Sequence, residues 1–403
     1  MLDVMIIGAG PAGLSTAISA AQHGLHVEIV DEYYQPGGRL LGQLHQEPDG
    51  EWWNGIEETE KLLEQIEPLH ITIHYSTSVY DLQKVNEKWI IYTNEGDWES
   101  QTVVIATGAT ESPIPVPGWT LPGVMSIGAA QVMTNVQRIK PGERGIVIGL
   151  NVLSFAITRE LQLAGVDVAA MLLPPPHLLS KKEAEPQEVL GSLLRFSHLA
   201  PSLLMRRGAP FVKGGFGKNL VTSFYPEKGM SVWGIPLQLR RTALEIKGKN
   251  QVEAIRVAKV NRKGELHNAI THDVDVDFVC IAGGLSPLVE LAAIAGCQFI
   301  HEDSLGGYVP VHNEKMETAV SGLYVAGNIT GIESAKVAIS QGTVAGLAVA
   351  KAMGARMNNG KINDALQEVE STRAAATIQF HPNIISVRKS MYKTEGIFTK
   401  VKE

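Results

Sequence analysis

Apolar and polar runs divide the start of the chain into a strand, a turn, a helix and a second strand. Val4 to Ile7 form a short apolar run of the kind that a buried parallel strand needs. Val27 to Val30 form another apolar run, and the residues between the two runs predict a glycine turn followed by a helix. The order predicts a β-α-β unit.

The turn after the first strand has the G-x-G-x-x-G spacing of a dinucleotide-binding site. Gly8 permits a sharp turn, Gly10 has no side chain to keep a pyrophosphate off the backbone, and Gly13 lets the helix pack closely on the strand. Pro11 and Ala12 stand at the start of the helix, where unpaired N–H groups and the helix dipole favour a phosphate.

An acid stands at the end of the second strand, at the distance expected for a ribose contact. Asp31 lies 18 residues after Gly13, where its carboxylate can accept both ribose hydroxyls of an adenosine. The neighbouring acid, Glu32, would repel a 2′-phosphate. Gly37 and Gly38 follow and again permit a close approach of the backbone to a ligand.

Further apolar runs predict a strand that ends at the same site. A small β-meander is predicted over residues 70–75, 77–82, 88–93 and 97–105. Its last strand ends at Ala106, Thr107 and Gly108. Open α/β sheets bind ligands at the carboxyl ends of their strands, so these residues are candidates for the same site.

A second unit of the same order begins at Arg144, after a proline-rich stretch that indicates a crossing between domains. It repeats strand, turn, helix and strand 141 residues after the first unit, but its turn carries Gly149, Asn151 and Ser154 in place of three glycines. A Cβ at Asn151 would crowd a pyrophosphate, yet adapted turns exist. The sequence therefore leaves NAD(P) binding at this turn open.

The middle of the chain predicts core elements of a second domain. Residues 187–207 form a leucine-rich helical stretch that Pro201 interrupts. For this stretch we favour a core helix over a partner-binding face. Residues 252–260 and 273–281 predict strands.

The last motif is a strand ending at Gly327 and Asn328, a loop, and a long helix that begins near Ser334. Small residues recur along this helix at helical spacing. They predict a close approach of the helix to a planar ligand or a sheet, and they are Ala335, Ala338, Gly342, Ala345 and Gly346.

Length and charge narrow the class of protein. A chain of 403 residues is long for one core and predicts two domains. The net charge of -7 argues against nucleic acid or an anionic membrane as the main partner. No apolar run approaches the roughly 20 residues of a membrane span, and the N-terminus shows no charged n-region, so we expect a cytoplasmic protein.

Cysteine and histidine usage excludes several chemistries. Cys280 and Cys297 stand in apolar contexts and are expected to be small core residues. The sequence has no C-x-x-C or C-x-x-x-x-C pair for a disulfide relay, and it lacks the cysteines for an iron–sulfur cluster. The 12 histidines show no metal-ligand spacing, so we predict no metal.

Four elements in this order resemble the flavoproteins with two dinucleotide-binding domains, the glutathione and thioredoxin reductase-like superfamily. They are GAGPAG, ATG, an interrupted second dinucleotide unit, and AGN followed by a helix. Residues 115–133, PVPGWTLPGVMSIGAAQVM, resemble the α subunits of bacterial amine and imino-acid dehydrogenases. The kinds concerned are hydrogen cyanide synthase B, opine oxidase A, proline or hydroxyproline dehydrogenase and heterotetrameric sarcosine oxidase.

The resemblance, which covers nearly all of residues 1–355, implies an α/β fold of two Rossmann-like domains. The FAD-binding domain would be discontinuous, at 1–112 and 285–355, with an NAD(P)-binding-like domain at 113–284 and a C-terminal extension at 356–403.

The resemblance also implies FAD as the cofactor. The residues implied to contact it are the turn Gly8, Gly10, Pro11, Ala12 and Gly13 at the pyrophosphate, Asp31 and Glu32 at the adenosine ribose, Gly38 and Arg39 in the adjoining loop, Val79 at adenine through its backbone, Ala106, Thr107 and Gly108 along the cofactor, and Gly327, Asn328, Ala335 and Lys336 near the ribityl chain and flavin.

Two of these residues, Asn328 and Lys336, bear on the charge around the bound flavin. Asn328 stands where the superfamily usually has an aspartate, so hydrogen bonding to the ribityl chain is kept while a charge is lost. Lys336 would favour the anionic reduced flavin if it points inward; the alternative is a solvated surface lysine.

The resemblance further implies partners. In such complexes substrate oxidation is attributed to a β-type flavoprotein subunit, and many relatives carry a cysteine-rich iron–sulfur module. Residues 356–403 contain no cysteine, so any cluster would come from a separate small subunit.

We therefore expect an FAD-binding α subunit of a multi-subunit amine or imino-acid dehydrogenase or oxidase, in which the sequence identifies no catalytic acid–base pair. Two alternatives remain. The first is a stand-alone NAD(P)H-dependent flavin reductase or diaphorase, and the second is a non-catalytic, flavin-bearing assembly subunit.

Overall fold

The computed structural model describes residues 2–47, 49–177, 180, 182–195, 221–222, 225–226, 229–232 and 234–393. The chain divides into two compact units, each built around its own sheet. Unit 1 comprises Met1–Gln43, Trp53–Thr110 and Leu285–Glu403, and unit 2 comprises Leu44–Trp52 and Glu111–Gly284.

A seven-stranded sheet forms the centre of unit 1. Its order is β5-β2-β1-β8-β7-β6, and β21 also pairs with β8. The strands β5, β2, β1, β8 and β21 run parallel, while β6, β7 and β8 form an antiparallel meander. These strands are β1 (Leu2–Ile7), β2 (Val27–Val30), β5 (Thr72–His74), β6 (Val79–Val85), β7 (Lys88–Thr93), β8 (Gly96–Ile105) and β21 (Leu323–Val325).

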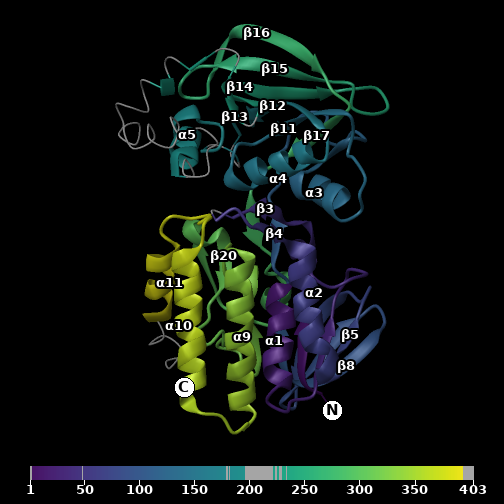
Figure 1. Ribbon diagram of the computed structural model, residues 1–403, viewed down its shortest axis with the longest axis vertical. Coiled ribbons are helices and arrows are strands. Elements are labelled where there is room, and N and C mark those ends of the chain that lie inside the picture. The colour runs from purple at the N-terminus through teal and green to yellow at the C-terminus, as the bar shows by residue number, and fades with distance from the viewer. Residues whose placement is uncertain are drawn as a thin grey trace. The chain divides into compact units, whose positions relative to one another are not determined.

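The helices of unit 1 flank this sheet, and Figure 1 shows α2, α1, α9 and α10 side by side. The N-terminal helices are α1 (Pro11–Ala21), η1 (Gly38–Gly42), α2 (Gly55–Ile66) and η2 (Glu67–Leu69). The remaining elements are β9 (Ala109–Glu111), β18 (Leu285–Pro287), α8 (Glu290–Ile294), β19 (Phe299–Glu302), η4 (Asp303–Leu305), β20 (Gly307–Pro310), η5 (Gly327–Thr330), α9 (Ala335–Ala352), α10 (Asn359–Ala375) and α11 (Ile384–Lys393).

The first β-α-β unit is confirmed, with β1 and β2 parallel neighbours joined through α1. The predicted meander is wrong at its first segment. Strand β5 pairs in parallel with β2, with Ile73 opposite Ile29. The left-handed residue Ser76, at a φ of 53°, lies between β5 and β6 and redirects the chain there.

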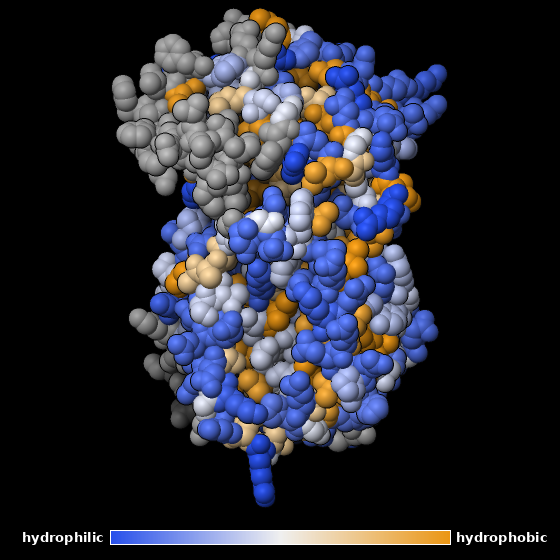
Figure 2. All heavy atoms as spheres, in the orientation of Figure 1, coloured by the Kyte–Doolittle hydropathy of each residue, from blue (hydrophilic) through white to orange (hydrophobic). Residues whose placement is uncertain are grey.

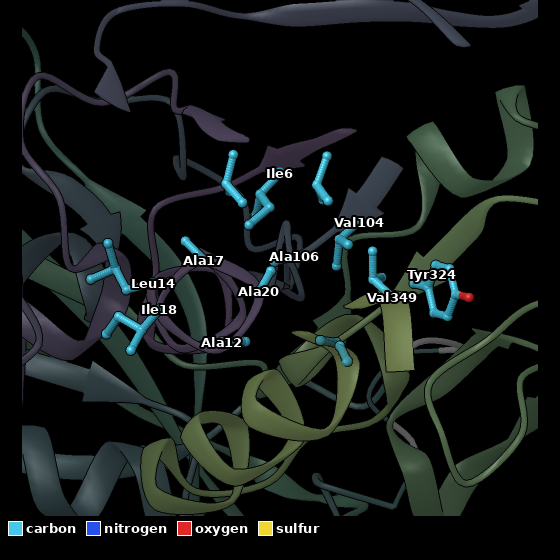
Figure 3. Packing of buried hydrophobic residues seen from close by; sticks show 14 of the residues in the cluster. Ile6, Ala12, Leu14, Ala17, Ile18, Ala20, Val104, Ala106, Tyr324 and Val349 are labelled. Carbon is cyan, nitrogen blue, oxygen red and sulfur yellow. The ribbon is translucent and has the colours of Figure 1, made fainter. Parts of the chain in front are cut away.

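Helix α9 packs directly on helix α1. A Cβ at Gly342 would collide with the carbonyl oxygen of Ala12, and a Cβ at Gly346 would lie 2.5 Å from that of Thr16. Figure 3 shows the apolar core at this contact, with Ala12 on α1 and Val349 on α9. The surface that these glycines approach is a helix, which corrects the predicted approach to a ligand or a sheet.

An eight-stranded sheet forms the centre of unit 2, in the order β10-β17-β11-β12-β14-β15-β16 with β13 beside β14. Its strands are β10 (Val124–Ser126), β11 (Arg144–Ile148), β12 (Asp167–Leu173), β13 (Met230–Val232), β14 (Ile235–Lys247), β15 (Ala254–Val260), β16 (Leu266–Asp275) and β17 (Phe278–Ile281). Unit 2 also contains helices α3 (Ile127–Asn135), α4 (Val152–Leu163) and α5 (Pro186–Arg195) and the short strand β3 (Leu44–Gln46). Strand β4 (Trp52–Asn54) begins at the last residue of this unit's first segment and continues into unit 1.

The second β-α-β unit is confirmed as β11, α4 and β12. The predicted strand over 273–281 is wrong in extent, because β16 ends at Asp275 and β17 begins at Phe278. Asp277 lies in the break between these two strands, where its carboxylate accepts the N–H groups of Glu143 and Arg144. Helix α5 contributes buried residues to the core as predicted, whereas the rest of the predicted 187–207 helix lies outside the described residues.

Hydrophobic side chains form the buried cores, and polar side chains are common at the surface. On the face drawn in Figure 2, hydrophobic residues are scattered among polar ones. Cys280 is buried and Cys297 partly buried, and burial raises the pKa of both thiols, that of Cys297 to about 11. Within the described ranges, no helix combines the length and apolar character that crossing a membrane requires.

Candidate functional site

The phosphate turn of unit 1 is an open helix N-terminus. Gly8 has a φ of 108°, and a Cβ there would lie 2.5 Å from the carbonyl oxygen of Ala106, while a Cβ at Gly13 would collide with the backbone of Gly8. Gly10 caps α1 without a side chain, and a Cβ there would meet nothing within 4 Å. In the part of the chain that the structure describes, the Gly13 and Ala12 N–H groups have no backbone acceptor. Unpaired donors beside open space fit a pyrophosphate.

Three other predicted segments meet this helix end. The Gly37 N–H donates to the Ala9 carbonyl at 2.8 Å, and a Cβ at Gly38 would lie 3.3 Å from the Gly10 Cα. From the far end of the sequence, a Cβ at Gly327 would lie 2.7 Å from the Ala12 Cβ. The turn, the 37–38 loop, the end of β8 and the end of β21 therefore come together.

Asp31 joins the end of β2 to the phosphate turn. Its Oδ2 accepts the Ala9 N–H at 2.5 Å and its Oδ1 accepts the Tyr33 N–H at 2.8 Å. Burial raises the pKa of this carboxyl, and the two backbone hydrogen bonds oppose the rise. Each carboxylate oxygen keeps a further acceptor position for a ribose hydroxyl. Glu32, by contrast, is exposed.

The loops on either side of this region are held by specific hydrogen bonds. Arg39 Nε donates to the Ala109 carbonyl at 3.0 Å, and Thr107 Oγ1 donates to the Leu288 carbonyl at 2.7 Å. Gly108 has a φ of 76° with open space at its Cβ position. These contacts hold Arg39, Thr107 and Gly108 in one part of unit 1.

Val79 is tied to the site only through its neighbours. It opens β6, and the Thr77 N–H donates to the Asp31 carbonyl at 2.9 Å. Only Ser78 therefore separates Val79 from Thr77, the residue that contacts Asp31. No contact between Val79 and the glycine turn is recorded in the described residues.

The segment from Gly327 to Ala335 lies between β21 and α9. The Gly327 N–H donates to Gln341 Oε1 at 3.0 Å, and Asn328 Oδ1 accepts the Glu333 N–H at 3.1 Å. Ser334 caps α9 by accepting the Val337 N–H at 3.4 Å, which confirms the predicted helix start, and Ala335 is buried at its first turn.

Lys336 lies on the exposed side of α9. Its ammonium stands 4.7 Å from the centroid of the Trp53 ring, within cation–π range. Trp53 Nε1 in turn donates to Gln43 Oε1 at 3.3 Å. The lysine is therefore exposed but held by an aromatic ring, an arrangement that its sequence context does not predict.

The second dinucleotide-like turn, in unit 2, is closed by its own side chains. Asn151 Oδ1 accepts the Ser154 N–H, and Ser154 Oγ accepts the Asn151 N–H, each at 2.9 Å. Asn151 Nδ2 also donates to the Ala282 carbonyl at 2.9 Å. A Cβ at Gly149 would collide with that same carbonyl. Two N–H groups of this turn, those of Asn151 and Ser154, are thus bonded to side chains, whereas Gly10 has no side chain to cap its turn.

Unit 2 also contains a buried acid that sequence reasoning missed. Glu160 Oε2 accepts amide N–H groups from Asn135 at 2.6 Å and Gln131 at 2.8 Å, and its Oε1 faces the Leu44 N–H at 3.5 Å. Burial raises the pKa of Glu160 to about 7 despite these hydrogen bonds. Its partners are amides and backbone, so we assign it a structural role.

Other residues that the sequence did not predict lie in or beside the 327–334 loop. They are Gln341, Glu333, Arg373 and Arg388, which bond to the loop or to one another. Their positions in the sequence carry no motif that could have found them. Among the described residues, no group of three or more His, Cys, Asp or Glu side chains is arranged to hold a metal.

Comparisons with known sequences agree with this geometry. The family described as pyridine nucleotide-disulphide oxidoreductase matches residues 2–189 and 222–342. The opine oxidase A chain of Agrobacterium tumefaciens (strain Ach5), which is named as a subunit, is 30% identical over 358 residues, which cover 86% of this chain and 65% of that protein. The alpha subunit of sarcosine oxidase from Corynebacterium sp. (strain P-1) is 25% identical over 87% of this chain and 33% of that protein. The chain thus spans less than two thirds of the length of these relatives.

Two solved structures share the fold. L-proline dehydrogenase from P. horikoshii has a TM-score of 0.64 at 20% identity, covering 91% of this chain and 58% of that chain. T. acidophilum thioredoxin reductase has a TM-score of 0.62 at 19% identity, covering 87% of this chain and 98% of that chain. The predicted α/β fold class, with a discontinuous domain and thioredoxin reductase-like topology, is confirmed, as is the resemblance to the opine and sarcosine oxidase proteins.

Proposed function

This chain belongs to the pyridine nucleotide-disulphide oxidoreductase family, and on that premise we propose that it is the FAD-binding α subunit of a multi-subunit amine or imino-acid dehydrogenase or oxidase. Electrons would pass through its FAD between an acceptor and a partner flavoprotein. The class of donor proposed is a compound with a CH–NH or CH–NH2 group, of the sarcosine, proline or opine type.

The observation that carries the proposal is the match to opine oxidase A at 30% identity over 86% of this chain. That protein and the sarcosine oxidase relative are both named as subunits. The chain spans only part of each, so the donor, the β-type flavoprotein partner and any small iron–sulfur partner are proposals for this chain.

The residues of unit 1 fit FAD. We assign the pyrophosphate to the N-terminus of α1, where Gly10 leaves the backbone open and the first-turn N–H groups are available. The adenosine ribose is assigned to Asp31 and Glu32, and the ribityl chain to Asn328. When bound, FAD would supply the redox chemistry, while these residues hold and orient it.

A stand-alone NAD(P)H-dependent flavin reductase is the second candidate. The capped turn at Asn151 and Ser154 argues against it, because these side chains bond to two N–H groups of the turn that a nicotinamide dinucleotide could otherwise use. A third candidate, of a different class, is a non-catalytic flavin-bearing assembly subunit. No described residue has the geometry that would single it out as a catalytic acid or base, so substrate oxidation is proposed for the partner.

The test begins with the purified chain and its visible flavin spectrum. NADH and a panel of amines and imino acids are then added without oxygen, with and without a co-expressed partner flavoprotein. Loss of flavin colour that needs both an amine and the partner supports the α-subunit proposal. Bleaching by NADH alone favours the reductase. A folded chain that cannot be reconstituted with FAD overturns both.

A further inference from the structure

A buried ion-pair network ties the C-terminal helices to the loop before α9. Glu333 is 8% exposed, and the arginines that approach it, Arg373 of α10 and Arg388 of α11, are 2% and 1% exposed. Figure 1 shows α10 beside α9 in unit 1. Charged side chains are rarely buried to this extent unless they are paired.

Two guanidinium nitrogens of Arg373 bind the Glu333 carboxylate. Its Nε lies 2.6 Å from Oε1 and its Nη2 lies 3.2 Å from Oε2. A bidentate pair of this kind matches one positive charge with one negative charge. Arg373 also contacts Glu370, which is 46% exposed, so water screens much of that acid's charge.

Arg388 brings a second guanidinium to the same carboxylate. Its Nη2 lies 2.6 Å from Glu333 Oε2 and donates to Thr330 Oγ1 at 3.2 Å. Over the described ranges, its buried Nε and Nη1 have no hydrogen-bond partner. Burial, and then the Arg388 charge, lower the pKa of His312 to about 3, so this imidazole is neutral. The buried part of the network described thus holds one positive charge in excess.

The network is bonded to the proposed flavin loop. The Glu333 N–H donates to Asn328 Oδ1 at 3.1 Å, so Asn328 offers a ligand its amide N–H groups. Thr330 Oγ1, which accepts from Arg388, donates to the Gly327 carbonyl at 2.8 Å. Gly327 is in turn the residue that approaches Ala12 at the phosphate turn.

We infer that Arg388 is a positioning residue for this loop and that its buried charge favours the reduced over the oxidised form of bound FAD. The inference rests on the proposed FAD site and deepens it, because it assigns control of the flavin's redox preference to the C-terminal helices. A flavin gains negative charge on reduction, and a cation in a low-dielectric interior is weakly screened. The N-terminus of α9 acts in the same direction.

The experiment compares the midpoint potential of bound FAD in three variants, measured by equilibration with redox dyes. Arg388→Gln removes the excess charge and keeps a donor for Glu333, and about a tenfold loss of preference for the reduced flavin is expected, or about 30 mV for a two-electron couple. Arg388→Lys keeps the charge and the potential. Glu333→Gln removes the negative charge, so its potential shifts in the opposite direction.

Lys389→Gln is the matched control, since Lys389 is the exposed neighbour of Arg388 on α11 and water screens its charge. A purely structural network would lower thermal stability in several variants without shifts of opposite sign. Equal or absent shifts in Arg388→Gln and Glu333→Gln, or an equal shift in Lys389→Gln, overturn the inference. If Arg388→Gln does not fold, the sign of the Glu333→Gln shift decides.

Failure of the inference and failure of the proposed function have different signatures. A chain that takes up FAD but shows no charge-dependent shift contradicts only the role of Arg388. A chain that folds and takes up no FAD contradicts the proposed function itself.

Discussion

The carboxylate of Asp31 accepts the backbone N–H of Ala9 at 2.5 Å, so the acid at the end of β2 closes the turn that follows β1. Its second oxygen accepts the Tyr33 N–H at 2.8 Å. The residue that the sequence assigns to a ribose is therefore also a structural part of the phosphate turn.

Replacement of Asp31 by Asn is expected to lower both the free energy of unfolding and the affinity for FAD. The new NH2 group would face a backbone N–H, and an unsatisfied donor of this kind costs about 1–3 kcal/mol. Urea unfolding of the apoprotein and fluorescence titration with FAD measure the two effects. Glu32→Gln is the matched comparison, because Glu32 is exposed. It should weaken FAD binding and leave the unfolding free energy within about 0.5 kcal/mol of wild type. If Asp31→Asn has the same free energy of unfolding as the wild type, the structural role of Asp31 is refuted.

Gly342→Ala is expected to destabilise unit 1. The added Cβ would collide with the Ala12 carbonyl at the start of α1, and such overpacking costs about 1–3 kcal/mol. Displacement of α1 should also weaken FAD binding, because the phosphate turn begins that helix. Gly360→Ala in α10 is the control, since its Cβ would make only ordinary contacts with Asn358. If the two variants unfold alike, the close contact between α1 and α9 is not what holds the turn.

Glu160 is expected to make stability fall as pH rises. Its pKa is raised by burial from the ordinary 4.5 to about 7, so between these values the folded state holds a proton that the unfolded state has lost. The stabilisation is complete below pH 4.5 and is lost as pH rises through about 7. Glu160→Gln keeps an acceptor for Gln131 and Asn135 without a titrating group. Its urea unfolding should therefore lack this part of the pH dependence; the same slope in both proteins would contradict the assignment.

Asn151 is expected to stabilise unit 2 as a helix cap. Asn151→Ala removes the side-chain acceptor for Ser154 and should lower the unfolding free energy by about 1 kcal/mol, whereas Asn151→Gly should cost only a few tenths. Neither change should alter FAD affinity, because the cap lies in the other unit. A loss of FAD binding in Asn151→Ala, measured beside its unfolding curve, would show that the two units are energetically coupled.

The parts of the site that the sequence predicts are those with local rules. Gly8, Gly10 and Gly13 serve a turn whose geometry depends on a few neighbouring residues, so their spacing alone carries the information. The start of α9 was predictable for the same reason, because Ser334 caps the helix with its own side chain.

The parts that the sequence does not predict depend on distant partners. The alternation of β5 indicates a strand but not its neighbour, and the neighbour proves to be β2. In the sequence, Arg373 and Arg388 look like surface residues. Both nevertheless pair with Glu333, which lies 40 positions before Arg373 (373 − 333) and 55 positions before Arg388 (388 − 333). Such pairings are set by tertiary packing, which a single sequence does not encode locally.

The pairing of β21 with β8 has a consequence for biosynthesis. Leu323 to Val325 complete the sheet that Leu2 to Ile7 begin, so a ribosome must make all of unit 2 before unit 1 can close. During that interval the face of α1 that packs on α9 is uncovered, and exposed apolar surface favours aggregation. Chaperone dependence should therefore be greatest for nascent chains that stop short of α9.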